Sequence, residues 1–298
     1  MFWTAFERIS LPGAALENVG LEPAEALRAR LVDPSRPGRL TTAPIRLGPF
    51  DRAIVSWNGT TPPGSRFELE LRAEGPDKWT SFYPLAVWSG ELDGPRSSCP
   101  GHEDGDGRID TDVLKLVRPA RALQIRVTFQ PGASGPVLTG LAALLADSSQ
   151  APAIADSPCG LPGLVLDVPT RSQLAFPEGA RSWCSPTSMT MLLEYWGRRL
   201  GRPLADPVPA AARLTWDSAY DGAGNWPFNT AYASTKGLRA FVTRLTSLAG
   251  AEVFLRREMP LALSIGWRDG ELPGAPLPAS SGHLVVLCGF DASGNPVV

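Results

Sequence analysis

The chain has 298 residues, of which 43% are hydrophobic and 19% are charged, and its formal net charge is -2. This length accommodates one large domain or two ordinary ones. A nucleic acid or an anionic membrane would find no strong positive charge to bind, so we expect neither as a partner. No apolar run reaches the roughly 18 residues that a membrane-spanning helix needs, and we therefore expect no membrane span.

The first half of the chain predicts an all-β domain. Phe67, Leu69 and Leu71 alternate with charged residues, which is the pattern of a half-buried strand. Short β-rich segments separated by turn-forming clusters are residues 41–50, 51–59, 65–74, 81–90 and 122–130. Several such strands at regular spacing favour an antiparallel β-sandwich, which we place over residues 1–147.

Residues 148–162 are rich in small residues and proline without periodicity, which indicates a linker. The sequence after the linker changes character. A loop is followed by an amphipathic helix, a long segment rich in aromatic residues and glycine, and then strands. We therefore expect a second domain, of α+β type, over residues 163–298.

Cys184 is the cysteine whose surroundings indicate chemistry. Met189, Leu192, Leu193 and Trp196 recur at helical spacing after it, and Pro186 suits a first helical turn, with Ser182 and Ser185 as candidate caps and Gly197 as a natural stop. This places Cys184 at a helix N-terminus. The free N–H groups there favour a thiolate, and with a basic partner such thiols have a pKa of about 3.5–7.5.

His283 is the candidate base for that thiol. It follows a Ser-Ser-Gly turn and opens the apolar run LVVLCGF, which predicts a buried strand with the histidine near its start. The chain has two histidines, and the other, His102, lies before the linker. Cys288 within the same apolar run is expected to be a small buried side chain.

Gln173 lies eleven residues before Cys184. A side-chain amide beside a helix that bears a nucleophile can donate to an oxyanion, together with the backbone N–H of the cysteine. A glutamine in a loop does not by itself indicate a catalytic role.

In this order, Gln173, the segment SWCSPTSMTMLLEYWG and the segment SGHLVVLCGFD resemble the C39-like peptidase family, a bacterial branch of the papain-like cysteine peptidase superfamily. The resemblance runs from about Val168 to the end of the chain. It implies a papain-like cysteine peptidase domain that acts on a peptide or protein substrate. Cys184 is then the nucleophile, His283 the base and Gln173 an oxyanion donor. No cofactor is implied.

The resemblance also extends to the first half, which is similar to a β-sandwich domain that precedes the peptidase domain in some bacterial members. We interpret it as a binding or positioning module, for which a carbohydrate or a component of the cell envelope is a possible ligand. The expected fold is therefore an all-β sandwich followed by an α+β papain-like domain.

The third member of the expected triad, an Asn or Asp that orients the histidine, falls just past Val298. Asp291 and Asn295 come too early, and Asn295 fits a turn. Either the sequence is a truncated product or the third member is lacking.

Residues 221–234 have the composition of a cleft wall. Asn225 and Asn229 are candidates for hydrogen bonds to a peptide, and Trp226 and Phe228 are candidates for apolar contact. The alternative is ordinary packing of a loop. Trp183, next to the candidate nucleophile, completes the expected substrate-binding set.

Several points stay open at this level. The four cysteines and two histidines show no ligand-like cluster, so we expect no metal, and Cys99 could pair with Cys159 only in a secreted protein. No signal peptide is visible, which leaves extracellular, cell-envelope and cytoplasmic locations open.

The alternative functions are acyl transfer of a transglutaminase-like or amidase-like kind, and a binding protein with an inactive hydrolase domain.

Overall fold

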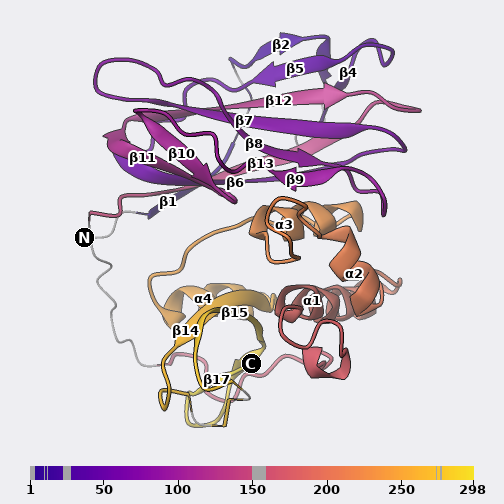
Figure 1. Ribbon diagram of the computed structural model, residues 1–298. Helices are drawn as coiled ribbons and strands as arrows, with labels where there is room; N and C mark the ends of the chain where they lie inside the picture. The colour runs from indigo at the N-terminus through magenta and orange to yellow at the C-terminus, as the bar shows by residue number, and fades with distance from the viewer. Residues whose placement is uncertain are drawn as a thin grey trace. The chain divides into compact units, whose positions relative to one another are not determined.

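The computed structural model describes residues 4–9, 11, 13–22, 28–149, 159–272, 274–275 and 277–298 (Figure 1). The chain divides into two compact units. The first unit comprises residues 1–153 together with 214–244, and the second unit comprises residues 154–213 together with 245–298. Most of the expected linker, at 150–158, lies outside the described residues. The domain limits expected from the sequence remain a prediction.

The first unit contains two antiparallel sheets. The seven-stranded sheet has the order β10 (Gly107–Asp110), β11 (Val113–Ala120), β6 (Phe50–Thr60), β13 (Val137–Ala146), β4 (Ala29–Leu31) and β3 (Val19–Leu21), with β1 (Thr4–Arg8) also paired to β13. The six-stranded sheet has the order β2 (Ala15–Glu17), β5 (Gly38–Thr41), β12 (Ala122–Gln130), β7 (Arg66–Glu74), β8 (Tyr83–Trp88) and β9 (Arg96–Ser98).

Four of the five strand segments expected from the sequence are confirmed, as β6, β7, β8 and β12. The alternation in β7 has the expected cause, since Phe67, Leu69 and Leu71 are buried while their neighbours are half-buried. The fifth segment, 41–50, was wrongly expected to be a strand. It makes one isolated bridge, at Ile45, because Pro44 lacks an N–H for a ladder and Gly48 has a φ of 122°.

Large aromatic side chains fill the core of the first unit. The Trp57 and Trp88 rings meet edge to face at 6.2 Å between centroids, and Phe228 of helix α3 (Trp226–Thr235) lies 6.0 Å from Trp57. Such pairs contribute about 0.5–1.5 kcal/mol beyond the burial of their area. Helix α3 packs on β6 within this unit (Figure 1).

The second unit is built from short elements. Its helices are the 3-10 helix η1 (Gln173–Ala175), α1 (Cys184–Leu200), α2 (Val208–Leu214), which ends at the unit boundary, and α4 (Leu248–Leu255). Its strands form two antiparallel pairs, β14 (Leu261–Trp267) with β15 (Ser280–Leu287), and β16 (Gly289–Phe290) with β17 (Pro296–Val297). Among the described residues, no helix is both long and apolar enough to cross a membrane.

Strand β15 and the residues that follow it separate two apolar clusters. Val286 and Cys288 pack with Met191 and Tyr195 of α1. Leu287, on the opposite face, packs with residues of α4, and Phe290 joins this second cluster. Because alternate residues of a strand face opposite sides, one strand joins both helices.

Helix α1 is longer than the sequence predicts. The expected stop, Gly197, lies inside the helix, which ends at Leu200 and is capped by Gly201 in the left-handed conformation with a φ of 65°. Gly197 is buried for a different reason. A Cβ there would lie 2.9 Å from the carbonyl oxygen of Arg202, so only glycine lets the returning chain approach the helix.

Cys288 gives a test of this core. Its side chain is 7% exposed and packs in the α1 cluster, and burial raises the pKa of its thiol. We expect Cys288→Ala to lower the free energy of unfolding by about 1 kcal/mol, as a small core truncation does. Urea unfolding measures this, and an unchanged midpoint would contradict the packing described.

Candidate active site

Cys184 is the first residue of α1, as the sequence predicts, and it is half-buried. The expected caps are wrong, because the N-cap position is occupied by Trp183, whose side chain makes no capping hydrogen bond. The first turn contains no acidic residue. The first N–H groups of the helix are therefore not bonded by a side chain at the cap, and no carboxylate of that turn opposes a negative charge on the sulfur.

The chain before α1 is a series of tight turns that fixes Trp183. The Trp183 ring packs against Phe176, with 6.1 Å between ring centroids. It lies so close over Gly179 that a Cβ at that position would be 1.9 Å from the ring. Backbone N–H groups of Ser182 and Trp183 both donate to the carbonyl of Gly179. Any side chain at position 179 would displace the residue that precedes Cys184.

Gln173 lies in η1, at the other end of the same turns. Its side-chain Nε2 donates to the carbonyl oxygen of Ala180 at 2.8 Å, and the side chain is half-buried. One N–H of the amide therefore stabilises the loop that leads to Cys184. The second N–H of the same nitrogen is the one that an oxyanion would need.

His283 lies near the start of β15, where it pairs with Ile265 of β14. Its ring meets the ring of Trp267 edge to face, with 5.6 Å between centroids. Burial lowers the pKa of the imidazole, which favours the uncharged form at neutral pH. An uncharged imidazole is the form that accepts a proton.

One hydrogen bond joins the helix of Cys184 to the strand of His283. The Oγ of Ser188 donates to the carbonyl oxygen of Leu284 at 3.3 Å. Ser188 follows Cys184 by one helical turn, on the same side of α1, and Leu284 is adjacent to His283. Cys184 thus lies one helical turn from one partner in this bond, and His283 is adjacent to the other.

The thiol and the imidazole are not hydrogen-bonded to each other in the described structure. His283 is in phase with Leu287, so regular alternation directs it to the face of β15 opposite α1. The ladder is irregular beside it, between Ile265 and Trp267. Direct pairing with Cys184 therefore needs the backbone at the start of β15 to rearrange, because rotation of a side chain alone does not carry it to the other face of a strand.

Asp291 and Asn295 are bonded to each other. The side-chain amide of Asn295 donates to Asp291 at 3.0 Å, and the backbone N–H groups of Ser293 and Asn295 donate to the same carboxylate. Hydrogen bonds from Asn295 and Ser293 hold the pKa of Asp291 below its usual value. Both residues thus stabilise the turn between β16 and β17, as expected for Asn295.

The expected substrate-binding residues of the middle segment lie in the first unit. Asn225 is 2% exposed and caps α3, accepting from the N–H of Phe228 at 3.1 Å and donating to Asp217 at 2.9 Å. Asn229 is also buried, and Trp226 is half-buried. Both amide atoms of Asn225 are therefore engaged in holding the fold. Substrate contact by Trp183, Asn225, Trp226 and Asn229 remains a prediction.

Asp217 and Asp112 organise the start of α3. Asp217 is fully buried, and its Oδ1 accepts from the N–H of Ser98 at 2.8 Å. Asp112 accepts from the N–H of Trp226 at 3.3 Å. Burial raises the pKa of Asp112 to about 6, with smaller contributions from the nearby charges of Asp217 and Asp110.

All four cysteines are free thiols in this structure. Burial, together with the charges of Asp217 and Glu68, raises the pKa of Cys99, and burial alone raises that of Cys288. Among the described residues, no three His, Cys, Asp or Glu side chains are placed to hold a metal ion.

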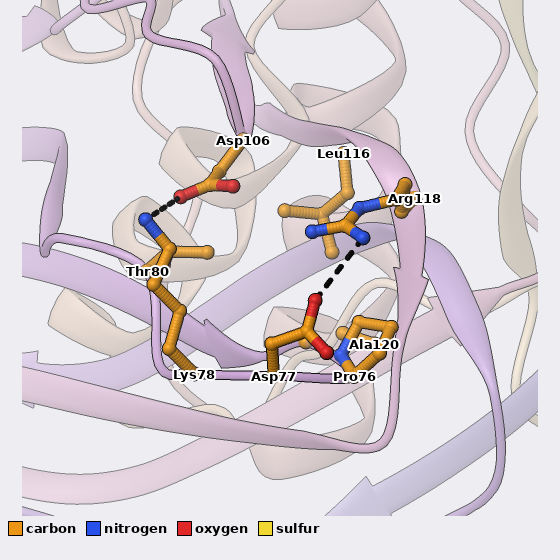
Figure 2. Close-up of a pocket in the computed structure, with 9 residues that line it drawn as sticks. Pro76, Asp77, Lys78, Thr80, Asp106, Leu116, Arg118 and Ala120 are labelled. Atoms are coloured by element: carbon orange, nitrogen blue, oxygen red, sulfur yellow. Dashed lines mark hydrogen bonds and ion pairs between the residues drawn. The ribbon is translucent and has the colours of Figure 1, made fainter.

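The small cavity in Figure 2 lies in the first unit and contains none of the candidate catalytic residues. Its walls carry two ion pairs, Lys78 with Asp106 at 3.2 Å and Arg118 with Asp77 at 3.3 Å (Figure 2). Lys78, Asp77 and Arg118 are mostly exposed, so these pairs contribute little to stability.

Ser188, Trp267 and Asp217 were not anticipated from the sequence. Ser188 lies one turn after Cys184, and this spacing could have identified it as a contact of the same helix face. Trp267 and Asp217 give no local signal, because their partners, His283 and Ser98, are distant in the sequence.

Asp112 predicts a pH dependence of stability. Its pKa in the folded state is above the ordinary 3.8, so its stabilising contribution is complete below about pH 4 and is lost as the pH rises through about 6. Relative to Asp112→Asn, the wild type should lose about 1–2 kcal/mol between pH 4 and 7, since partial exposure reduces the full value of about 1.4 kcal/mol per pKa unit. Parallel curves of unfolding free energy against pH for the two proteins would refute this.

Two curated proteins show a distant likeness to the chain. Both are named D-inositol 3-phosphate glycosyltransferase, from Mycobacterium avium and Mycolicibacterium paratuberculosis, and each is 26% identical over 242 residues. The alignments cover 72% of this chain and 50% and 48% of those proteins. The chain thus spans about half the length of these relatives.

Two family models match the chain. Residues 9–146 match the Peptidase C39 N-terminal domain, and residues 165–298 match the Peptidase_C39 like family. The second match supports a peptidase-type function in general. Together the two matches cover most of the chain, which belongs to the C39-like peptidase family.

Proposed function

We propose that the chain is a cysteine peptidase with a papain-like catalytic domain, in which Cys184 is the nucleophile and His283 the general base. The observation that carries the proposal is the position of Cys184 at the start of α1, in a helix that is hydrogen-bonded to β15 beside His283. The family match over residues 165–298 supports the same class of reaction.

The proposed reaction begins when the Cys184 thiolate attacks the carbonyl carbon of a peptide bond. The negative charge on the carbonyl oxygen is held by the backbone N–H of Cys184 and the second amide N–H of Gln173. His283, which has taken the thiol proton, gives it to the leaving amine as the C–N bond breaks. The acyl group remains on the sulfur as a thioester.

Water then completes the cycle. His283 removes a proton from water, whose oxygen attacks the thioester carbonyl. The C–S bond breaks, the carboxylic acid product leaves, and the proton returns to the Cys184–His283 pair. Trp183, fixed by Gly179 and Phe176 beside the nucleophile, is the proposed substrate contact nearest to the scissile bond.

Acyl transfer is the second candidate, because the thioester accepts an amine as readily as water in the same geometry. A product assay with added primary amines distinguishes the two outcomes. New amide products in place of free acid would favour the transferase. The glycosyltransferases that resemble the chain share only distant similarity, and no sugar transfer is proposed from it.

The nucleophile assignment predicts that Cys184→Ala abolishes hydrolysis while the free energy of unfolding changes little, since Cys184 is only half-buried. We expect a fall in kcat of at least about 1,000-fold on a peptide library. Cys288→Ala is the matched control, and it should keep its turnover per folded molecule. Retention of most activity by Cys184→Ala would overturn the proposal.

A further prediction concerns the rate at which iodoacetamide labels each cysteine at pH 7. Cys184 should react faster than Cys99 and Cys288, because burial disfavours the thiolate of both. His283→Ala should reduce the labelling of Cys184 alone. Peptide mapping by mass spectrometry gives the extent at each cysteine. Equal labelling of Cys184 and Cys288 would favour the inactive-binding-protein alternative.

A further inference from the structure

The peptidase-family match and the architecture divide the chain differently. The match spans residues 165–298, whereas residues 214–244, within it, belong to the first unit. This segment leaves the second unit at α2 and returns to it before α4. Its attachment to the two sheets is made by three sets of contacts.

The first set joins the end of α3 to β6. The Oγ of Ser234, which is 5% exposed, accepts from the N–H of Gly59 at 2.6 Å and donates to the carbonyl of Gly59 at 2.9 Å. One hydroxyl thus satisfies both backbone groups of Gly59, as a neighbouring strand would. Thr235 approaches Gly90, where a Cβ would lie 3.0 Å from its methyl group.

The second set holds the extended chain after α3. The amide of Asn58 donates to the carbonyl of Ala240 at 2.8 Å and accepts from its N–H at 3.2 Å. The Oγ of Ser56 accepts from the N–H of Val242 at 3.2 Å. Ser56 and Asn58 are both buried and lie on the same face of β6. Their side chains bind the backbone of the segment without regard to its sequence.

The third set fixes the start of the segment. The Oγ of Ser218 donates to the carbonyl of Arg96 at 2.9 Å, and Asp217 accepts from Ser98 as described above. Phe228 then inserts its ring 5.1 Å from that of Trp88. The contacts of the segment therefore reach strands of both sheets, β6 and β8–β9.

We propose that the first unit is an obligatory frame for the peptidase, because it holds residues 214–244, which fall within the peptidase-family match, in their folded conformation. The face of β6 at Ser56, Asn58 and Gly59 is occupied by this segment and is not a free surface for a ligand. The expected effect on peptide cleavage rests on the proposed peptidase function. The claim that the first unit keeps residues 214–244 folded does not depend on that function.

The test uses the full chain with the double substitution Ser56→Ala and Asn58→Ala. Amide hydrogen exchange, read by mass spectrometry, should accelerate on the order of tenfold or more at residues 238–242, because three hydrogen bonds to this stretch are lost. KM for peptide substrates should rise by a similar factor. Iodoacetamide labelling of Cys184, which reports on the second unit alone, should keep its rate.

Thr42→Ala is the matched control. Thr42 is 2% exposed, and its Oγ accepts from the N–H of Ile125 within the six-stranded sheet. This variant loses a buried hydroxyl–backbone bond without loss of a bond to the segment. Ser234→Ala is the second test variant, in case the double variant does not fold.

Exchange at 238–242 no faster in the test variants than in Thr42→Ala would overturn the holding of the segment. Faster exchange with kinetic constants equal to those of Thr42→Ala would overturn the claim that catalysis depends on it. A wild-type chain that exchanges as expected but cleaves no peptide would refute the proposed function, and with it the catalytic consequence. In that case the exchange result still supports the holding of the segment by the first unit.

Discussion

The packing of α1 against β15 is the constraint on which the candidate site depends. Buried residues of the helix meet Val286 and Cys288, and Ser188 bonds the strand backbone at Leu284. Because the other face of β15 packs on α4, the strand cannot shift along the helix without disturbing both clusters. The middle of α1 and the end of β15 are thereby held at defined positions. The proposed chemistry needs the start of β15, which lies outside both clusters, to bring His283 to the side of α1.

The first unit imposes a second constraint. Polar side chains form hydrogen bonds to main-chain groups that a neighbouring strand would otherwise bond. Ser56, Asn58 and Ser234 bond main-chain groups across the interface between β6 and residues 214–244. Removal of one partner leaves a buried polar group unsatisfied, which costs about 1–3 kcal/mol. A segment held in this way is stable only while the sheet beside it is folded. Residues 214–244, which fall within the peptidase-family match, are thereby bound to the sheets of the first unit.

The sequence predicted the features that have local causes. Alternation in β7 and the helix that begins at Cys184 follow from residue spacing, and both are found. Strand β13 was missed, because its run of leucine and alanine favours a helix by propensity. Pairing on both sides with β1, β6 and β4 overrides that preference. The burial of Asn225 against Asp217 was not predicted, because it depends on tertiary packing that spacing does not reveal.

The distance between the Cys184 sulfur and the nearer ring nitrogen of His283 tests the central claim most directly. A crystal structure of the protein alkylated at Cys184 by a peptide-based inhibitor would measure it with the site occupied. The account predicts that the occupied site brings the imidazole to within about 4 Å of the sulfur. A separation beyond roughly 6 Å in that complex would contradict the pairing, because no proton can then pass directly between the two side chains.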